Sequence, residues 1–140
     1  QGMVSNIRLA LSDKSTALQK LISFVGAMKV DSAIGKEITD YAHKPQNALM
    51  HQKIQNSLLA VLTPIASEII EEGIKEGSFS TSYPEEAAEM LLIYSSVVFD
   101  DMNEMAQAEW ERKAAGFVFN MERLLGIKQG SLSEIINFIN

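Results

Sequence analysis

Residues 69–92, IIEEGIKEGSFSTSYPEEAAEMLL, limit the fold more than any other part of the chain. The segment starts as an apolar helix, meets a glycine at Gly77, passes through a polar turn and reopens as a helix at Pro84. Glycine takes the left-handed conformation that commonly ends a helix, and proline is tolerated in a first turn, where no amide donor is needed. Ser82 and Glu85 have the spacing of a capping box. The segment therefore predicts two helices joined by a tight turn.

Apolar residues recur at helical spacing through nearly the whole chain, and no segment alternates in the manner of a strand. Asp13 and the Asp31-Ser32 pair are the expected N-caps of the first two helices, and Pro45 favours a helix end just before it. Pro64 falls inside the longest apolar pattern and predicts a kink, because it removes an amide donor and crowds the preceding turn. We predict an all-α antiparallel bundle of about five to six helices with a kinked long central helix, at residues 13–30, 31–44, 47–76, 84–103, 107–125 and a short helix after Ser131-x-x-Glu134.

Composition narrows the functional classes. The chain has 140 residues, enough for one domain with a sizeable core, and a formal net charge of −6 with no basic stripe. Since nucleic-acid affinity comes mostly from Lys and Arg, this chain alone is not expected to bind DNA. Cysteine is absent, which excludes disulfides and thiolate metal sites. No uncharged apolar run is long enough to span a bilayer and the N-terminus lacks the pattern of a signal peptide, so we expect a cytoplasmic protein without membrane contact.

A surplus of apolar helix surface predicts a homodimer. The segment MLLIYSSVVF, residues 90–99, contains no charged residue, and a helix that is apolar all round must be covered on several sides. Residues 117–125, FVFNMERLL, also carry apolar groups in several directions. A four-helix bundle between two subunits, built from 84–103 and 107–125, accommodates this surface. The alternative is that both helices form the centre of a monomeric bundle. The expected contact residues are Leu91, Ser95, Val98, Ala114, Phe117, Met121 and Leu124.

Long, adaptable and aromatic side chains mark a candidate ligand cavity. Ligand sites are mostly apolar with a few polar groups, often between the helices of a bundle, and methionine adapts to varied shapes. The alternative is that the same residues fill the core. A small apolar or amphipathic effector is expected, because no cluster of charges converges in the sequence. The candidate ligand-binding residues are Met50, Ile54, Leu58, Met90, Tyr94, Phe99, Met102 and Trp110.

Catalytic and metal sites find little support in the sequence. His43 and His51 lack the i, i+4 spacing of a helical metal pair, and no serine, threonine or lysine stands in a nucleophile motif. Asp100 and Glu104 share one helix face and offer a possible cation site, with a solvated surface as the simpler interpretation. We expect neither catalysis nor a cofactor or metal.

The order and spacing of these helix ends resemble the C-terminal regulatory domain of tetracycline-repressor-type (TetR-family) transcriptional regulators. The strongest local likeness lies in residues 69–92 and a second in FVFNMERLLGIKQGSL, residues 117–132, within a likeness that spans about 14–132. The resemblance implies an N-terminal helix-turn-helix domain that reads operator DNA as a dimer. It also implies that an effector bound in a cavity of the C-terminal domain shifts the population between DNA-competent and DNA-incompetent arrangements.

Residues 1–12 have no room for such a DNA-reading domain. We expect the chain to be a fragment of a longer regulator, and the alternative is a natural protein that has lost this domain. Gln1-Gly2 before Met3 is interpreted as a cloning remnant and MVSNIRLAL as the end of a connecting helix, with the effector-binding and dimerisation domain at 13–140. The leading hypothesis is a TetR-type sensing and dimerisation domain, in a repressor that contacts DNA only through a domain absent from this chain. Two rivals stay open. One is a stand-alone helical adaptor that binds a partner protein through an apolar groove, and the other a small helical enzyme with a metal held by Asp100, Glu104 and a histidine.

Overall fold

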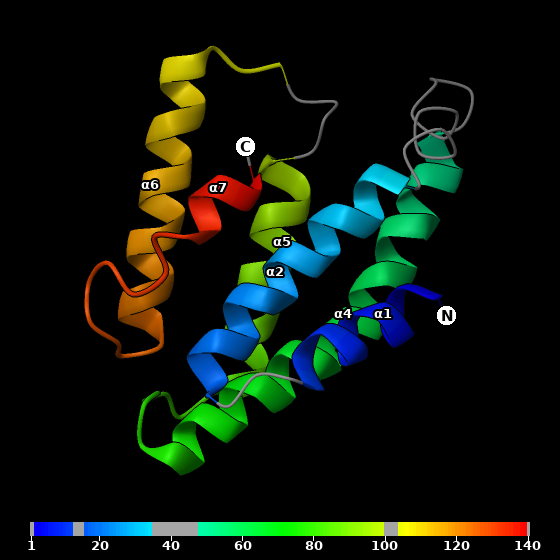
Figure 1. Ribbon diagram of the computed structural model, residues 1–140. Coiled ribbons are helices and arrows are strands. Elements are labelled where there is room, and N and C mark those ends of the chain that lie inside the picture. The colour runs from blue at the N-terminus through cyan, green and yellow to red at the C-terminus, as the bar shows by residue number, and fades with distance from the viewer. Residues whose placement is uncertain (1, 13–15, 35–47, 100–103, 140) are drawn as a thin grey trace.

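The protein is all-α, as the sequence predicts. The structure, a computed structural model, describes residues 2–12, 16–34, 48–99 and 104–139. Within these ranges no strand forms. Figure 1 shows the helices of the described ranges, which are α1 (Gly2–Ser12), α2 (Ala17–Ile34), α4 (Ala48–Glu76), α5 (Pro84–Val98), α6 (Gln107–Leu124) and α7 (Ile135–Ile139).

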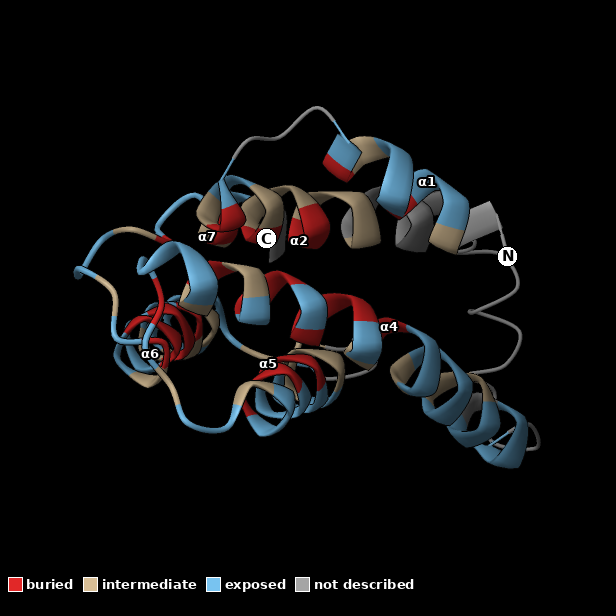
Figure 2. Ribbon diagram, turned by 90° about the horizontal axis from the view of Figure 1, so that it is seen from below, coloured by how far each residue is buried: buried red, intermediate tan, exposed pale blue. Residues whose placement is uncertain are grey.

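The long helix α4 forms the middle of the bundle. Figure 2 shows α1, α2 and α7 on one side of α4, and α5 and α6 on the other. Helix α4 packs against both α2 and α5, whereas α1 packs on α2, and α7 packs on α2 and α6. The antiparallel bundle with a long central helix is therefore confirmed for the described ranges.

The turn between α4 and α5 forms where the sequence places it. Gly77 has a φ of 84°, in the left-handed region that favours glycine, and α5 begins at Pro84. The capping box at Ser82 is wrong, because the N-cap residue is Tyr83 and no side chain caps the helix. The Tyr83 amide instead donates to the Thr81 hydroxyl at 3.1 Å, inside the turn.

Other predicted helix ends differ from the observed ones. Helix α2 runs through Asp31-Ser32 to Ile34, so a new helix does not start there. The physical reason is that no proline or glycine interrupts residues 27–34, and a capping residue inside an unbroken helix does not end it. Asp13, Lys44 and Pro45 lie outside the described residues.

The last two helices also end or begin differently from the prediction. Helix α5 ends at Val98 rather than near residue 103, and residues 100–103 lie outside the described ranges. The short terminal helix starts at Ile135 after turns at 131–134. Ser131 donates to the Lys128 carbonyl oxygen instead of accepting from an amide, so it does not cap this helix.

The core lies between α2, the C-terminal half of α4, α5 and α6. Figure 2 shows the buried faces of these helices turned toward one another. Phe24, Leu21 and Ile70 are fully buried there, and Leu125, Leu132 and Ile135 close the core at the C-terminal end of the chain.

One buried carboxylate fixes the C-terminal segment. Glu122 on α6 is 2% exposed, and its Oε2 atom accepts hydrogen bonds from the Gly130 amide at 3.0 Å and the Leu132 amide at 2.9 Å. A buried charge is tolerated when donors such as these replace its water. Glu122 therefore ties α6 to the turns that lead into α7.

The two halves of α4 differ in burial. In residues 62–76, which we call the closed half, Leu62, Ile65 and Ile70 are buried in the core. In residues 48–61, the open half, no described side chain is buried. Pro64 lies close to the boundary, and Figure 1 shows the axis of α4 changing direction partway along the helix. Proline removes a backbone hydrogen bond and commonly bends a helix at such a position.

Helix α1 joins the same core. Ile7 is fully buried and Leu11 nearly so, both within the cluster formed by α2 and α4. Arg8 lies 3.6 Å from Glu68 of α4, although both side chains are more than half exposed. The apolar side of α1 therefore packs on the domain, and its N-terminal end lies beside the open half of α4 (Figure 1).

Candidate ligand groove and subunit surface

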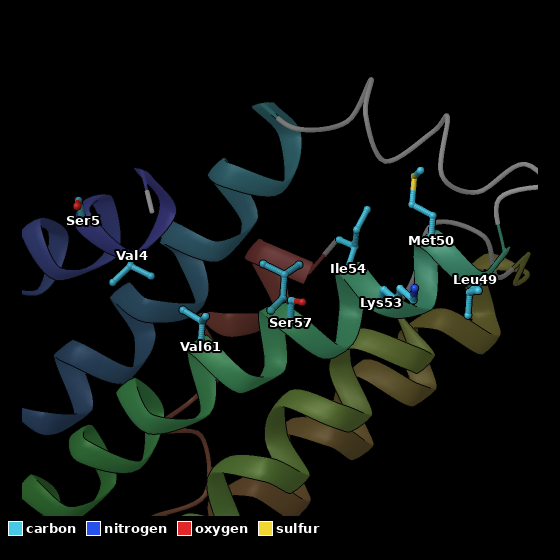
Figure 3. Close-up of a pocket in the computed structure, with 9 residues that line it drawn as sticks. Val4, Ser5, Leu49, Met50, Lys53, Ile54, Ser57 and Val61 are labelled. Carbon is cyan, nitrogen blue, oxygen red and sulfur yellow. The ribbon is translucent and has the colours of Figure 1, made fainter.

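A groove with a volume of about 890 Å³ lies between the N-terminal end of α1 and the open half of α4. Its size falls within the range of small-molecule sites in proteins. Leu49, Met50 and Val61 are 65%, 45% and 44% exposed, so the groove is open along one side. Figure 3 shows side chains of α4 and α1 along this groove, whose lining residues are Val4, Ser5, Leu49, Met50, Lys53, Ile54, Ser57, Leu58 and Val61.

The opposite face of the open half contacts α5. The Gln55 side-chain amide donates to the Ser96 carbonyl oxygen on α5 at 3.3 Å. At 100° per residue, Gln55 lies on the far side of the helix from Lys53 and Ser57, which line the groove. One stretch of α4 therefore touches the groove on one face and α5 on the other.

Charge is unevenly distributed along α4. Lys53 is the single charged residue among the described residues that line the groove, and the sequence from 48 to 67 contains no carboxylate. All the acidic residues of α4 lie in the closed half, at Glu68, Glu71, Glu72 and Glu76. Glu72 forms an ion pair with Lys20 of α2, whose Nζ atom lies 2.6 Å from the carboxylate. The described lining of the groove is thus an apolar surface with one cation and two serine hydroxyl groups.

Only part of the predicted ligand set lines this groove. Met50, Ile54 and Leu58 do so, because all three lie on one face of the open half. Met90 is 54% exposed on α5, and Met102 lies outside the described residues. Sequence reasoning missed Lys53, Ser57 and the α1 contribution, since helical periodicity does not reveal which distant helix lies alongside.

The aromatic residues of the predicted ligand set form a separate cluster. The Tyr94 ring stacks on Phe117 of α6, with centroids 5.4 Å apart and planes 6° apart. Phe99 meets Tyr94, Phe117 and Trp110 edge-on, at centroid distances of 6.0, 5.8 and 6.2 Å. Aromatic pairs at these distances stabilise packing beyond the area that they bury. These rings join α5 to α6 rather than lining the groove.

The predicted dimer residues lie mainly inside the subunit. Leu91, Ala114, Phe117 and Met121 are buried in one chain, and Ser95, Val98 and Leu124 are half-buried. The apolar surface of the four buried residues is already covered by the subunit's own core. The exposed apolar residues of α5 lie on another face, and sequence reasoning could not choose it because MLLIYSSVVF is apolar on nearly all sides.

An exposed apolar stripe runs along α5. Met90, Ile93, Tyr94 and Val97 follow i, i+3, i+4, i+7 spacing and are 54%, 49%, 38% and 55% exposed. We call these residues the α5 stripe. On neighbouring α6, Phe119 is 42% exposed, and the Arg123 guanidinium lies 5.6 Å from its ring centroid. A contiguous apolar face of this kind commonly marks a contact with another molecule.

Most of the candidate metal ligands lie outside the residues that the structure describes. His43, Asp100 and Asp101 lie outside the described residues, and Glu104 is exposed. In the described part of the chain, no group of three or more histidine and carboxylate side chains is placed to hold a metal ion. Among the same residues, no helix combines the length and apolar character needed to cross a bilayer.

Comparison with known proteins identifies the family. A family described as "Tetracyclin repressor-like, C-terminal domain" matches residues 29–119. The match spans all of α4 and α5 and extends from the end of α2 into α6, so it includes the open half of α4 and the α5 stripe. No curated protein matches the chain. On the breadth of this match, the chain belongs to the family of tetracycline-repressor-like C-terminal domains.

Proposed function

We propose that this chain is the effector-sensing and dimerisation domain of a TetR-type transcriptional regulator. One observation carries the proposal: the open half of α4 lines an apolar groove on one face and contacts α5 on the other. A ligand in the groove and a subunit docked on α5 would therefore act on the same short stretch of helix. The resemblance to TetR-type regulators implies that effector binding is linked to DNA binding by a separate helix-turn-helix domain.

The open half of α4 is suited to carry such a coupling. It has no buried described side chain, so few contacts resist its displacement. A ligand packed against Ile54 and Leu58 favours one position of this segment, and the hydrogen bond from Gln55 to Ser96 transmits that position to α5. A ligand shifts an equilibrium only by its difference in affinity for the two states, so the groove must differ between them. Bending near Pro64 leaves the closed half in place.

The subunit contact in this proposal uses the α5 stripe rather than the residues predicted from sequence. Two copies that pair through α5 and α6 would cover Met90, Ile93 and Phe119. Gly116 on α6 supports close approach, since a methyl group built there meets nothing within 4 Å. Obligate homodimers bury on the order of 2,000 Å² or more in total, a size that needs both helices.

The dimer is tested by light scattering with size-exclusion chromatography at micromolar concentration. The unaltered chain should elute as a dimer, and Ile93→Glu should elute as a folded monomer because it buries an unpaired charge in the contact. The matched control is Leu9→Glu, since Leu9 is a 71% exposed apolar residue on α1, remote from the α5 stripe. A monomeric unaltered chain would remove the dimer from the proposal and favour the helical adaptor.

The effector site is tested by native mass spectrometry of protein purified from cells. A retained effector appears as an added mass that denaturation releases. Ser57→Phe fills the groove and should abolish the added mass, whereas Ser82→Phe, in the exposed turn before α5, should keep it. An added mass that survives Ser57→Phe would place the ligand elsewhere.

A further inference from the structure

The groove differs in charge from the protein that surrounds it. The chain carries a formal net charge of −6. Yet the two segments that form the groove, residues 2–12 and 48–61, contain Arg8 and Lys53 and no carboxylate. Arg8 faces Glu68, whereas Lys53 has no ion pair among the described residues. Among the described residues that line the groove, one positive charge therefore lacks an ion pair, inside an acidic domain.

Polar and apolar groups are separated within the groove. Lys53 and Ser57 are one turn apart on α4, so their ammonium and hydroxyl donors lie on the same side of the helix. From Lys53, the apolar residues Ile54, Leu58 and Val61 continue toward α1. At 1.5 Å per residue, the distance along the helix from Lys53 to Val61 is about 12 Å. The polar headgroup of a ligand and its apolar chain can therefore bind at separate parts of the groove.

We infer that the groove binds an amphipathic monoanion of the medium-chain carboxylate class, with the carboxylate at Lys53 and Ser57. The alkyl chain extends along Ile54, Leu58 and Val61 toward Val4 of α1. A length of about 12 Å corresponds to a chain on the order of ten carbons. This inference rests on the proposed effector site and adds the chemical class of its ligand.

Other ligand classes fit the groove less well. A cationic amphiphile would place its charge beside Lys53, with no described carboxylate among the lining residues to balance it. A phosphate or other dianion is normally held by several cations or convergent amide donors, whereas Lys53 is a single point charge. A neutral alcohol fits the apolar part and leaves the lysine without a counter-ion. The carboxylate pairs with Lys53 and accepts from the Ser57 hydroxyl, the two donors that α4 places beside the apolar stripe.

The experiment is isothermal titration calorimetry with decanoate, decan-1-ol and decyltrimethylammonium against the unaltered chain, Lys53→Met and Lys75→Met. Methionine keeps most of the apolar stem of lysine and removes the charge. Lys75 lies exposed in the last turn of the same helix, away from the groove, so it is a matched control. Because Lys53 is itself exposed, the loss of decanoate affinity in Lys53→Met should be roughly three- to tenfold. Lys75→Met should leave decanoate affinity unchanged.

The same titrations contain the results that overturn the inference. The unaltered chain should prefer decanoate to decan-1-ol, and this preference should shrink in Lys53→Met and with added salt. Equal affinity for both ligands, or no decanoate binding, overturns the carboxylate assignment. Ser57→Phe distinguishes failure of the proposed effector site from failure of the carboxylate assignment. If the unaltered chain shows no preference for decanoate but Ser57→Phe blocks the binding of decan-1-ol, the groove is still the effector site and only the carboxylate assignment is wrong. If Ser57→Phe changes the affinity for none of the ligands, both the groove as effector site and the carboxylate assignment are wrong.

Discussion

The closed and open halves of α4 contain similar apolar residues in opposite surroundings. Ile65, Ile69 and Ile70 of the closed half are buried between α2 and α5, whereas Leu49 and Met50 of the open half are exposed. The difference is the number of described elements that cover each half. One continuous helix can therefore be fixed at one end and available to a ligand at the other.

Several contacts fix the closed half. Phe79, in the turn after α4, packs against Gly73, where a methyl group would clash with the Phe79 ring. The Ser80 amide donates to the Leu125 carbonyl oxygen at 2.7 Å, which ties this turn to the end of α6. In the open half, the Gln55 side-chain amide reaches another helix, at the Ser96 carbonyl oxygen of α5. Substitutions in the closed half should therefore lower the free energy of unfolding more than substitutions in the open half.

The largest expected difference comes from the same substitution in each half. Ile70→Ala should lower the free energy of unfolding by about 3–4 kcal/mol, because Ile70 is fully buried and leaves a cavity. Ile54→Ala should cost less than about 1 kcal/mol, since Ile54 is only half-buried at the groove. Urea denaturation followed by circular dichroism measures both. Equal losses would show that the two halves are equally anchored in solution.

Removal of the buried carboxylate of α6 should have the next largest effect. Glu122→Ala leaves the Gly130 and Leu132 amides without their acceptor and should cost about 2–3 kcal/mol. Hydrogen exchange at these two amides should accelerate in step. Glu134→Ala is the control, because Glu134 is an exposed glutamate in the same segment and should change stability by less than about 0.5 kcal/mol. A silent Glu122→Ala would mean that α7 is held without this contact.

A methyl group at Gly73 tests the contact between the closed half and Phe79. Gly73→Ala should cost about 2 kcal/mol, because the added Cβ overlaps the buried Phe79 ring. At an unobstructed helix position the same change would stabilise the protein by up to about 1 kcal/mol. In the Phe79→Leu background the cost should fall, and a double-mutant cycle measures this coupling. Additive effects would argue against the Gly73 and Phe79 contact.

The smallest expected effect concerns the ion pairs between α4 and its neighbours. Lys20→Met should cost about 0.5–1 kcal/mol, because the Lys20 ammonium contacts both oxygens of the Glu72 carboxylate. Arg8→Met should cost less, since Arg8 and Glu68 are 3.6 Å apart and largely exposed. The difference should diminish in 1 M salt, where charges are screened within about 3 Å. Persistence of the full effect at high salt would assign it to apolar packing of the lysine stem.

Local sequence signals predicted the fold better than they predicted the site. Gly77 and Pro84 marked their helix ends because each restricts the backbone at its own position. The helix start predicted at Asp31 and Ser32 was wrong, because a capping residue acts only where a helix begins, and α2 continues through both residues. In the site, Met50, Ile54 and Leu58 were found together because they share one helical face.

The rest of the site depends on packing over long distances in the sequence. Val4 of α1 and Lys53 of α4 line one groove although 49 positions separate them, and no local pattern records that proximity. Leu91 and Ile93 are equally apolar, but Leu91 is buried and Ile93 is 49% exposed. The choice between them depends on where α4 and α6 lie around α5.

The sequence by itself determined the all-α class, the long central helix and the turn between α4 and α5. These features follow from helical periodicity and from the backbone restrictions of glycine and proline, which act over a few residues. Only the tertiary structure decided that α1 faces the open half of α4 and which side of α5 stays exposed. Burial depends on which distant helix covers a surface, and the apolar effect that drives it has no direction of its own.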